Sequence, residues 1–173
     1  MNRRNAVKKI AIASGSLITL PFWMSCNSHD SPVTHLSSFS AAEQETLAAI
    51  TDTIIPAGNA IGALSVGIDK YLQKLIDNCY AKDVQDNIKT QLQALEKMAQ
   101  TLHKNSFRDC RQLYREQLFS EFSLSPDKPQ KDFFNIIKSE TINGFTTSKE
   151  VMLNYFHYKV APGHYYGCID VKA

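Results

Sequence analysis

The sequence lacks the short motifs that usually mark a catalytic or cofactor site. It contains no G-x-G-x-x-G or P-loop pattern for a nucleotide and no C-x-x-C-H for covalent haem. It also contains no C-x-x-C or H-E-x-x-H pattern for a metal, and its five histidines are scattered along the chain. We therefore predict no catalytic, cofactor-binding or metal-binding residue in this chain.

The chain also lacks an excess of basic residues once its first segment is set apart. Four of its 19 Lys and Arg lie before Cys26, where no Asp or Glu occurs, which leaves 15 basic against 17 acidic residues. No basic run with interleaved aromatic residues remains, although such runs are typical of nucleic-acid binding. We therefore expect no nucleic-acid partner.

No apolar run reaches the length of about 20 residues that a transmembrane helix needs. The apolar run of residues 10–24 contains Gly15 and three hydroxyl residues, and it follows a basic start that includes Arg3 and Arg4. This order is typical of an export signal. Arg3-Arg4 resembles the twin-arginine motif, although Ala6 and Val7 stand where that motif has bulkier apolar residues. An ordinary secretory signal that begins with two arginines is the alternative.

The apolar run ends in "WMSC", which resembles a lipobox with Trp23 in the usual place of leucine. In that interpretation Cys26 is acylated and becomes the first mature residue, and its acyl chains anchor the protein firmly. Plain cleavage and a retained anchor are the alternatives. We thus expect a signal peptide at 1–26, a polar tether at 27–38, a helical domain at 39–173 and a membrane-anchored lipoprotein in the periplasm.

The domain is predicted to be all-α, an irregular bundle of about six helices with a non-helical aromatic C-terminal tail. Ser40 and Glu43 form a capping box that starts the first helix, and Pro56 ends it. A glycine-rich loop follows. Apolar residues at helical spacing then predict a second helix at about 66–80 and a third at 84–102.

Three more helices are expected before the tail. Ser106 with Asp109 starts the fourth, the turn "SLSPDKP" ends it, and the fifth runs to Gly144 as its C-terminal cap. Ser148 caps a short sixth helix that ends at about residue 155. Cys79 and Cys110 fall on apolar helical faces, where they serve as small hydrophobic residues or pair with each other.

The last 17 residues, "HYKVAPGHYYGCIDVKA", are too irregular for a helix and too aromatic for a disordered tail. They either fold back over the bundle or form a contact surface, in which Tyr165 and Tyr166 are the candidates for a partner interface. A metal site or a Cys-His nucleophile built from His157, His164 and Cys168 would make the chain a small enzyme. The sequence offers neither the third group that would complete such a site nor a turn that would stabilise an oxyanion.

Two segments of the chain resemble the gluconate 2-dehydrogenase subunit 3 family. The first is "SETINGFTTSKEVMLNYFHYKVAPGHYYGC", with a T-x-x-G-[FY]-x-T-S pattern at 141–148 and a P-G-x-Y-x-G-C pattern at 162–168. The second is "ITDTIIPAGNAIGALSVGIDKYLQKLIDNCY", in which Asp52 precedes an I-I-P turn. The resemblance covers about residues 40–170.

This resemblance implies a non-catalytic small subunit of a membrane-associated dehydrogenase. In such complexes a large flavoprotein of the glucose methanol choline type holds FAD and oxidises a sugar or a sugar acid such as gluconate. A c-type cytochrome with haem c commonly takes the electrons. The small subunit helps the flavoprotein to fold and carries it through the twin-arginine pathway. An independent periplasmic lipoprotein that binds a ligand or scaffolds the envelope is the alternative.

The number of cysteines leads to one further expectation. If Cys26 is acylated, three cysteines remain, and an odd number in an oxidising compartment indicates a free thiol or a bond to another chain. Cys168 lies in the tyrosine-rich tail, so we expect it to form a disulfide with the large subunit. An unpaired or intrachain Cys168 is the alternative.

Overall fold

The computed structural model describes residues 37–58, 60–161 and 163. These residues form helices and connecting turns without any strand, which confirms the all-α prediction. The six α-helices are α2 (Ala41–Ile54), α3 (Ile68–Cys79), α4 (Lys82–His103), α5 (Gln112–Leu124), α6 (Lys128–Thr147) and α7 (Lys149–Asn154). Two short 3-10 helices, η1 (Leu64–Val66) and η2 (Phe107–Asp109), precede α3 and α5.

The first helix of the domain begins and ends where the sequence predicts. The backbone N–H of Ser40 donates to Oε2 of Glu43 at 2.8 Å, and the N–H of Glu43 donates to Oγ of Ser40 at 3.3 Å. These two bonds satisfy amides that the first turn of a helix leaves free. At the other end α2 stops at Ile54, two residues before Pro56. The capping box is therefore confirmed.

Ser38, directly before the predicted start of the helical domain, is bound to two helices of that domain. The N–H of Ser38 donates to Oδ2 of Asp77 on α3 at 3.0 Å, and its carbonyl accepts from Nζ of Lys89 on α4 at 2.9 Å. The next side chain, Phe39, is buried in the core. The backbone of Ser38 therefore ties the start of the domain to α3 and α4.

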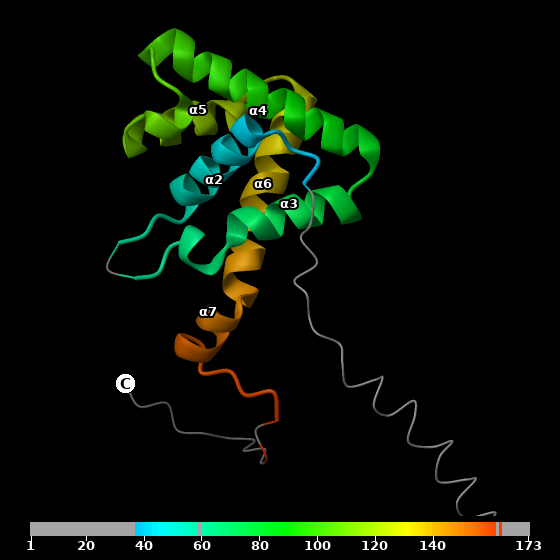
Figure 1. Ribbon diagram of the computed structural model, residues 1–173, viewed down its shortest axis with the longest axis vertical. Helices are drawn as coiled ribbons and strands as arrows, with labels where there is room; N and C mark the ends of the chain where they lie inside the picture. The colour runs from blue at the N-terminus through cyan, green and yellow to red at the C-terminus, as the bar shows by residue number, and fades with distance from the viewer. Residues whose placement is uncertain (1–36, 59, 162, 164–173) are drawn as a thin grey trace, which may run out of the picture. The chain divides into compact units, whose positions relative to one another are not determined.

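Helix α6 packs against α3, α4 and α5 and contributes to the centre of the core (Figure 1). The largest fully buried side chains come from η2 and from all α-helices except α7, as their apolar spacing predicts. They are Leu47, Ile50, Ile68, Leu72, Ile76, Ile88, Leu92, Leu95, Phe107, Leu118, Phe122 and Phe133. Helix α7 contributes one buried side chain, Val151, which is 4% exposed.

The predicted start of the fourth helix is wrong. Ser106 donates to Oδ2 of Asp109 at 2.9 Å, but the turn between them is the 3-10 helix η2, and α5 begins only at Gln112. A residue of another helix stabilises the turn, because the N–H of Phe107 donates to Oε2 of Glu96 on α4 at 3.0 Å. This hydrogen bond and the burial of the Phe107 side chain hold the turn that precedes α5 in the sequence.

Gly144 is also not the end of a helix, because α6 continues through it to Thr147. A Cβ on Gly144 would lie 2.7 Å from two ring atoms of Tyr71 on α3. Carbon atoms in ordinary contact are about 3.5–4.0 Å apart, so only glycine allows this approach. The glycine serves the contact between α3 and α6 instead of ending α6.

Three residues of the predicted apolar stripes are exposed. Leu102 and Leu113 are 60% and 61% exposed, and the thiol of Cys79 is exposed at the end of α3. Cys110 is buried, as predicted, and its Sγ contacts the carbonyl of Ser106 at 3.3 Å. Both cysteines are free thiols, so the alternative of a bond between them is wrong.

Candidate partner interface

The T-x-x-G-[FY]-x-T-S residues build the end of α6. Thr141 is fully buried and its Oγ1 donates to the carbonyl of Ile137 at 2.7 Å. One turn later Gly144 lies against Tyr71 of α3. The first contact needs a hydroxyl side chain, and the second needs a residue without a Cβ. The pattern therefore fixes the final turns of α6 against the bundle.

Ser148 makes the corner between α6 and α7. Its N–H and its Oγ both donate to the carbonyl of Phe145, at 3.2 and 2.8 Å. The same Oγ accepts from the N–H of Val151 at 3.4 Å and so caps α7, as the sequence predicts. One serine thus ends one helix and begins the next. The pattern as a whole sets the position of α7.

Asp52 of the I-I-P segment joins two helices. Its Oδ2 accepts from Nη2 of Arg115 on α5 at 2.8 Å. Arg115 also donates to Oε1 of Gln112 at 2.6 Å, and Gln112 donates to the carbonyl of Thr53 at 3.1 Å. These bonds connect the last turn of α2 with the first turn of α5. Asp52 therefore has a structural role next to the turn at Pro56.

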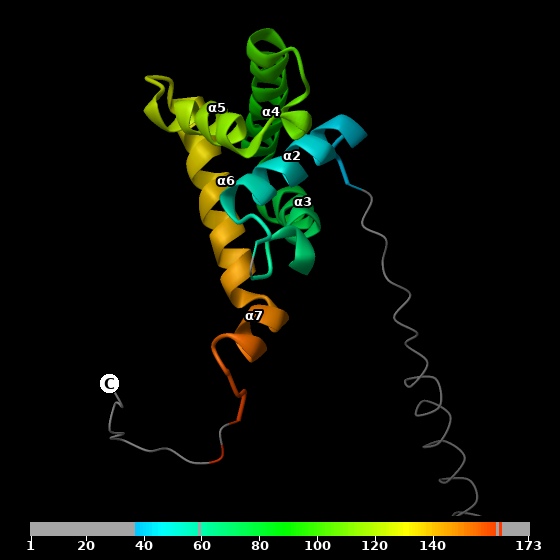
Figure 2. The same cartoon turned by 90° about the vertical axis from the view of Figure 1, so that its left-hand side faces the viewer.

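Exposed apolar side chains gather at α7 and the residues after it. Helix α7 lies beyond the end of α6, away from α4 and α5, in both views (Figures 1 and 2). We call residues 153–160 the aromatic segment, because five large apolar side chains in it are exposed. They are Leu153 at 50%, Tyr155 at 51%, Phe156 at 59%, Tyr158 at 49% and Val160 at 89%.

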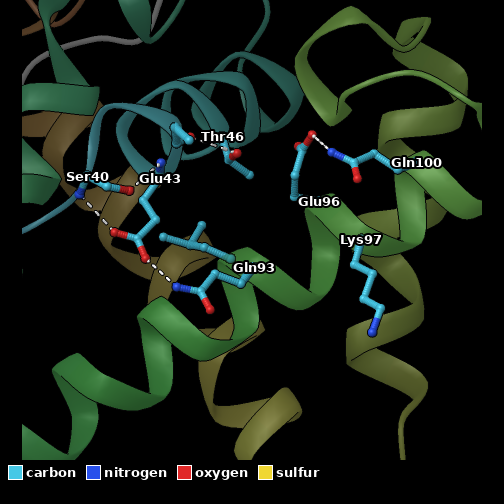
Figure 3. Close-up of a pocket in the computed structure, with 9 residues that line it drawn as sticks. Ser40, Glu43, Thr46, Gln93, Glu96, Lys97 and Gln100 are labelled. Carbon is cyan, nitrogen blue, oxygen red and sulfur yellow. Dashed lines mark hydrogen bonds between the residues drawn. The ribbon is translucent and has the colours of Figure 1, made fainter.

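A polar groove of about 300 Å³ lies between α2 and α4 (Figure 3). Oε1 of Glu43 accepts from Gln93 at 2.8 Å, and Oε1 of Glu96 accepts from Gln100 at 3.0 Å. Burial alone would raise the pKa of the Glu43 carboxyl. Hydrogen bonds from Ser40 and Gln93, with the charge of Lys89, instead lower the pKa overall. Glu43 thus joins α2 to α4, and Glu96 joins α4 to η2 through the N–H of Phe107.

Most of the predicted site residues lie outside the described part of the chain. These are Arg3, Arg4, Cys26, His164, Tyr165, Tyr166 and Cys168. His157 is described, and it is an exposed residue in a left-handed conformation with φ of 49°. Among the described residues, no three His, Cys, Asp or Glu are placed to hold a metal ion. No helix in the same residues is long and apolar enough to cross a membrane.

Three exposed apolar residues lie directly before the tail, in which the sequence predicts a contact surface. The sequence predicts that the tail begins at residue 157, whereas Leu153, Tyr155 and Phe156 are already exposed. The predicted sixth helix includes Leu153 and Tyr155 and ends just before Phe156, and the sequence carries no sign that this helix lies at the edge of the bundle. The run of aromatic residues "YFHY" was the signal that could have identified them.

Comparison with known proteins agrees with the resemblance of the two segments. No curated protein and no solved structure matches the chain. Residues 41–163 match the family described as gluconate 2-dehydrogenase subunit 3, and this range includes Asp52, the corner at Ser148 and the whole aromatic segment. Because the match covers more than half of the sequence, the chain belongs to the gluconate 2-dehydrogenase subunit 3 family.

Proposed function

We propose that this chain is the non-catalytic small subunit of a periplasmic, membrane-associated, FAD-dependent sugar or gluconate dehydrogenase. In this proposal it helps a flavoprotein subunit of the glucose methanol choline type to fold, carries it through the twin-arginine pathway and anchors it. Membership of the family supports a role as a dehydrogenase subunit, because the family is described as one subunit of such an enzyme.

The export role depends on one observation, the pair Arg3-Arg4 in front of a domain of this family. Twin-arginine transport moves proteins that are already folded, commonly because they received a cofactor in the cytoplasm. The sequence of this chain has no nucleotide, haem or metal motif that would require such loading. The signal therefore serves a second protein, which folds around its FAD and leaves the cytoplasm bound to this chain.

Anchoring follows from Cys26 in the same proposal. An acylated Cys26 would hold the complex at a membrane, because two or three acyl chains bind far more firmly than one. Residues 27–38 then form the polar tether between the anchor and the helical domain. The electrons taken by FAD would pass to a c-type cytochrome with haem c at the same membrane.

The test is the location of the flavoprotein. Replacing both Arg3 and Arg4 with Lys keeps the charge of the signal and removes the arginine pair. The control replaces Lys8 and Lys9 with Arg, which keeps both the charge and the pair. We expect the first variant to leave the flavoprotein and its activity in the cytoplasm and the control to export both. Unchanged periplasmic activity with the first variant would contradict the carrier role.

A further inference from the structure

The aromatic segment is exposed although its backbone is held in place. The N–H of Phe156 donates to the carbonyl of Val151 at 3.2 Å, and the N–H of Tyr158 donates to the carbonyl of Met152 at 2.9 Å. The second bond forms because the chain turns at His157, where φ is 49°. The side chains of this segment are thus presented on a backbone that is hydrogen-bonded to α7.

Helix α7 is in turn fixed to the bundle. Ser148 caps it, Val151 is buried, and Tyr71 lies against Gly144 one turn before the corner. A surface that is ordered before binding loses less conformational entropy when a partner covers it. Exposed apolar side chains on an ordered backbone are therefore suited to binding, and contiguous patches of this kind mark interaction sites.

The charge of this surface indicates which kind of partner it fits. Residues 149–160 contain two basic residues, Lys149 and Lys159, and one acidic residue, Glu150. Attraction to anionic lipids is worth about 1 kcal/mol for each basic residue and usually involves clusters of them. Nucleic-acid binding likewise depends on many basic side chains. In contrast, the cores of protein interfaces are poor in charge and rich in Tyr and Phe.

We propose that the aromatic segment is the surface through which this chain binds the flavoprotein subunit. This inference rests on the proposed function, because a chain of this family is one subunit of a larger enzyme. Its partner presents an apolar groove that takes Phe156 and Leu153. The same groove has hydrogen-bonding groups at its edge for the hydroxyls of Tyr155 and Tyr158, which desolvated hydroxyls require.

The experiment compares two pairs of substitutions in the full chain, produced together with the flavoprotein. The first pair is Phe156→Ser with Tyr158→Ser. The matched control is Leu113→Ser with Leu124→Ser, because these leucines are 61% and 82% exposed and lie on α5. Circular dichroism establishes that each variant is folded. The Kd between the purified subunits and the amount of flavoprotein retained by each variant are then measured.

We expect the first pair to raise the Kd at least about 30-fold and the control to change it less than about threefold, since central aromatic residues dominate binding. If both variants are folded and bind the flavoprotein with the Kd of the unchanged chain, this assignment is overturned and the proposed function stands. Failure of the unchanged chain to bind the flavoprotein would overturn both. The assignment is also wrong if the first pair keeps the flavoprotein but loses binding to vesicles of phosphatidylethanolamine and phosphatidylglycerol.

Discussion

Arg115 and Asp52 form a partly buried ion pair that joins α5 to α2, with 2.8 Å between Nη2 and Oδ2. The two side chains are 13% and 27% exposed. The Nε of Arg115 is buried and makes no hydrogen bond within the described part of the chain. Asp52 is therefore the counter-ion of a guanidinium whose Nε has no hydrogen-bond partner among the described residues.

Replacing Asp52 with Asn should destabilise the domain by about 1–3 kcal/mol, because the charge of Arg115 then loses its counter-ion in a partly buried position. The control is Asp86→Asn, since Asp86 pairs with Lys82 on the surface of α4 at 3.1 Å. An exposed pair of this kind contributes about 0.5 kcal/mol or less. Urea unfolding measures both changes in stability. Equal losses of stability in Asp52→Asn and Asp86→Asn would show that burial does not strengthen the pair of Asp52 with Arg115.

Gly144→Ala should destabilise the domain, because the new methyl group would lie 2.7 Å from the ring of Tyr71. The same substitution should be stabilising by up to about 1 kcal/mol in a Tyr71→Ala background, since alanine favours a helix more than glycine. Thermal unfolding of the two single variants and the double variant gives the coupling between the sites. A Gly144→Ala effect of the same sign in both backgrounds would contradict the role of the glycine contact.

The lowered pKa of Glu43 predicts a dependence of stability on pH. A carboxyl whose pKa is lower in the folded than in the unfolded state stabilises above its ordinary value of 4.5, and this contribution is lost as the pH falls through the folded value. The difference in the free energy of unfolding between the unchanged chain and Glu43→Gln should thus be constant near neutral pH. It should shrink as the pH falls below 4.5. Urea unfolding at several pH values measures the difference.

The control for this pH effect is Glu45→Gln on the same helix. Glu45 is 59% exposed and pairs with Arg108 at 3.0 Å, so its replacement should cost less than about 0.5 kcal/mol at any of these pH values. A difference for Glu43→Gln that does not change between neutral and acid pH would mean that the charge of Glu43 does not stabilise the fold.

Cys168 is predicted to form a disulfide with the flavoprotein subunit. Cys168 lies outside the described residues, so the bond stays a prediction; among the described cysteines Cys110 is buried and Cys79 is an exposed free thiol. Non-reducing electrophoresis of the native complex should show a band at the summed mass that disappears with reductant and in Cys168→Ser. Separate subunits without reductant would rule the bond out.

Local signals in the sequence predicted the helices well where the structure depends on neighbouring residues. The capping box of Ser40 and Glu43 is an interaction over three positions, and it forms as expected. Gly144 shows the limit of such reasoning, because a glycine near a helix end is compatible with a cap and with a close contact. Only the position of Tyr71, which is more than 70 residues away in sequence, decides between them.

The candidate interface was predicted only in part for a similar reason. Composition identified an aromatic end of the chain, but periodicity placed Tyr155 and Phe156 in or beside a helix and said nothing about its neighbours. Helix α7 has only six residues and buries Val151 alone, so Met152 is only partly buried and Leu153 stays exposed. Whether a helix lies inside or at the edge of a bundle depends on tertiary packing, which the spacing of apolar residues does not encode.

The most direct test of the account is to isolate this chain from its native cells in mild detergent and identify its partners by mass spectrometry. The account predicts a flavoprotein of the glucose methanol choline type in equal amount. After dissociation, the absorbance of FAD should follow the flavoprotein and be absent from this chain. Isolation of this chain as a single species, or FAD that stays with it, would contradict the assignment as a non-catalytic dehydrogenase subunit.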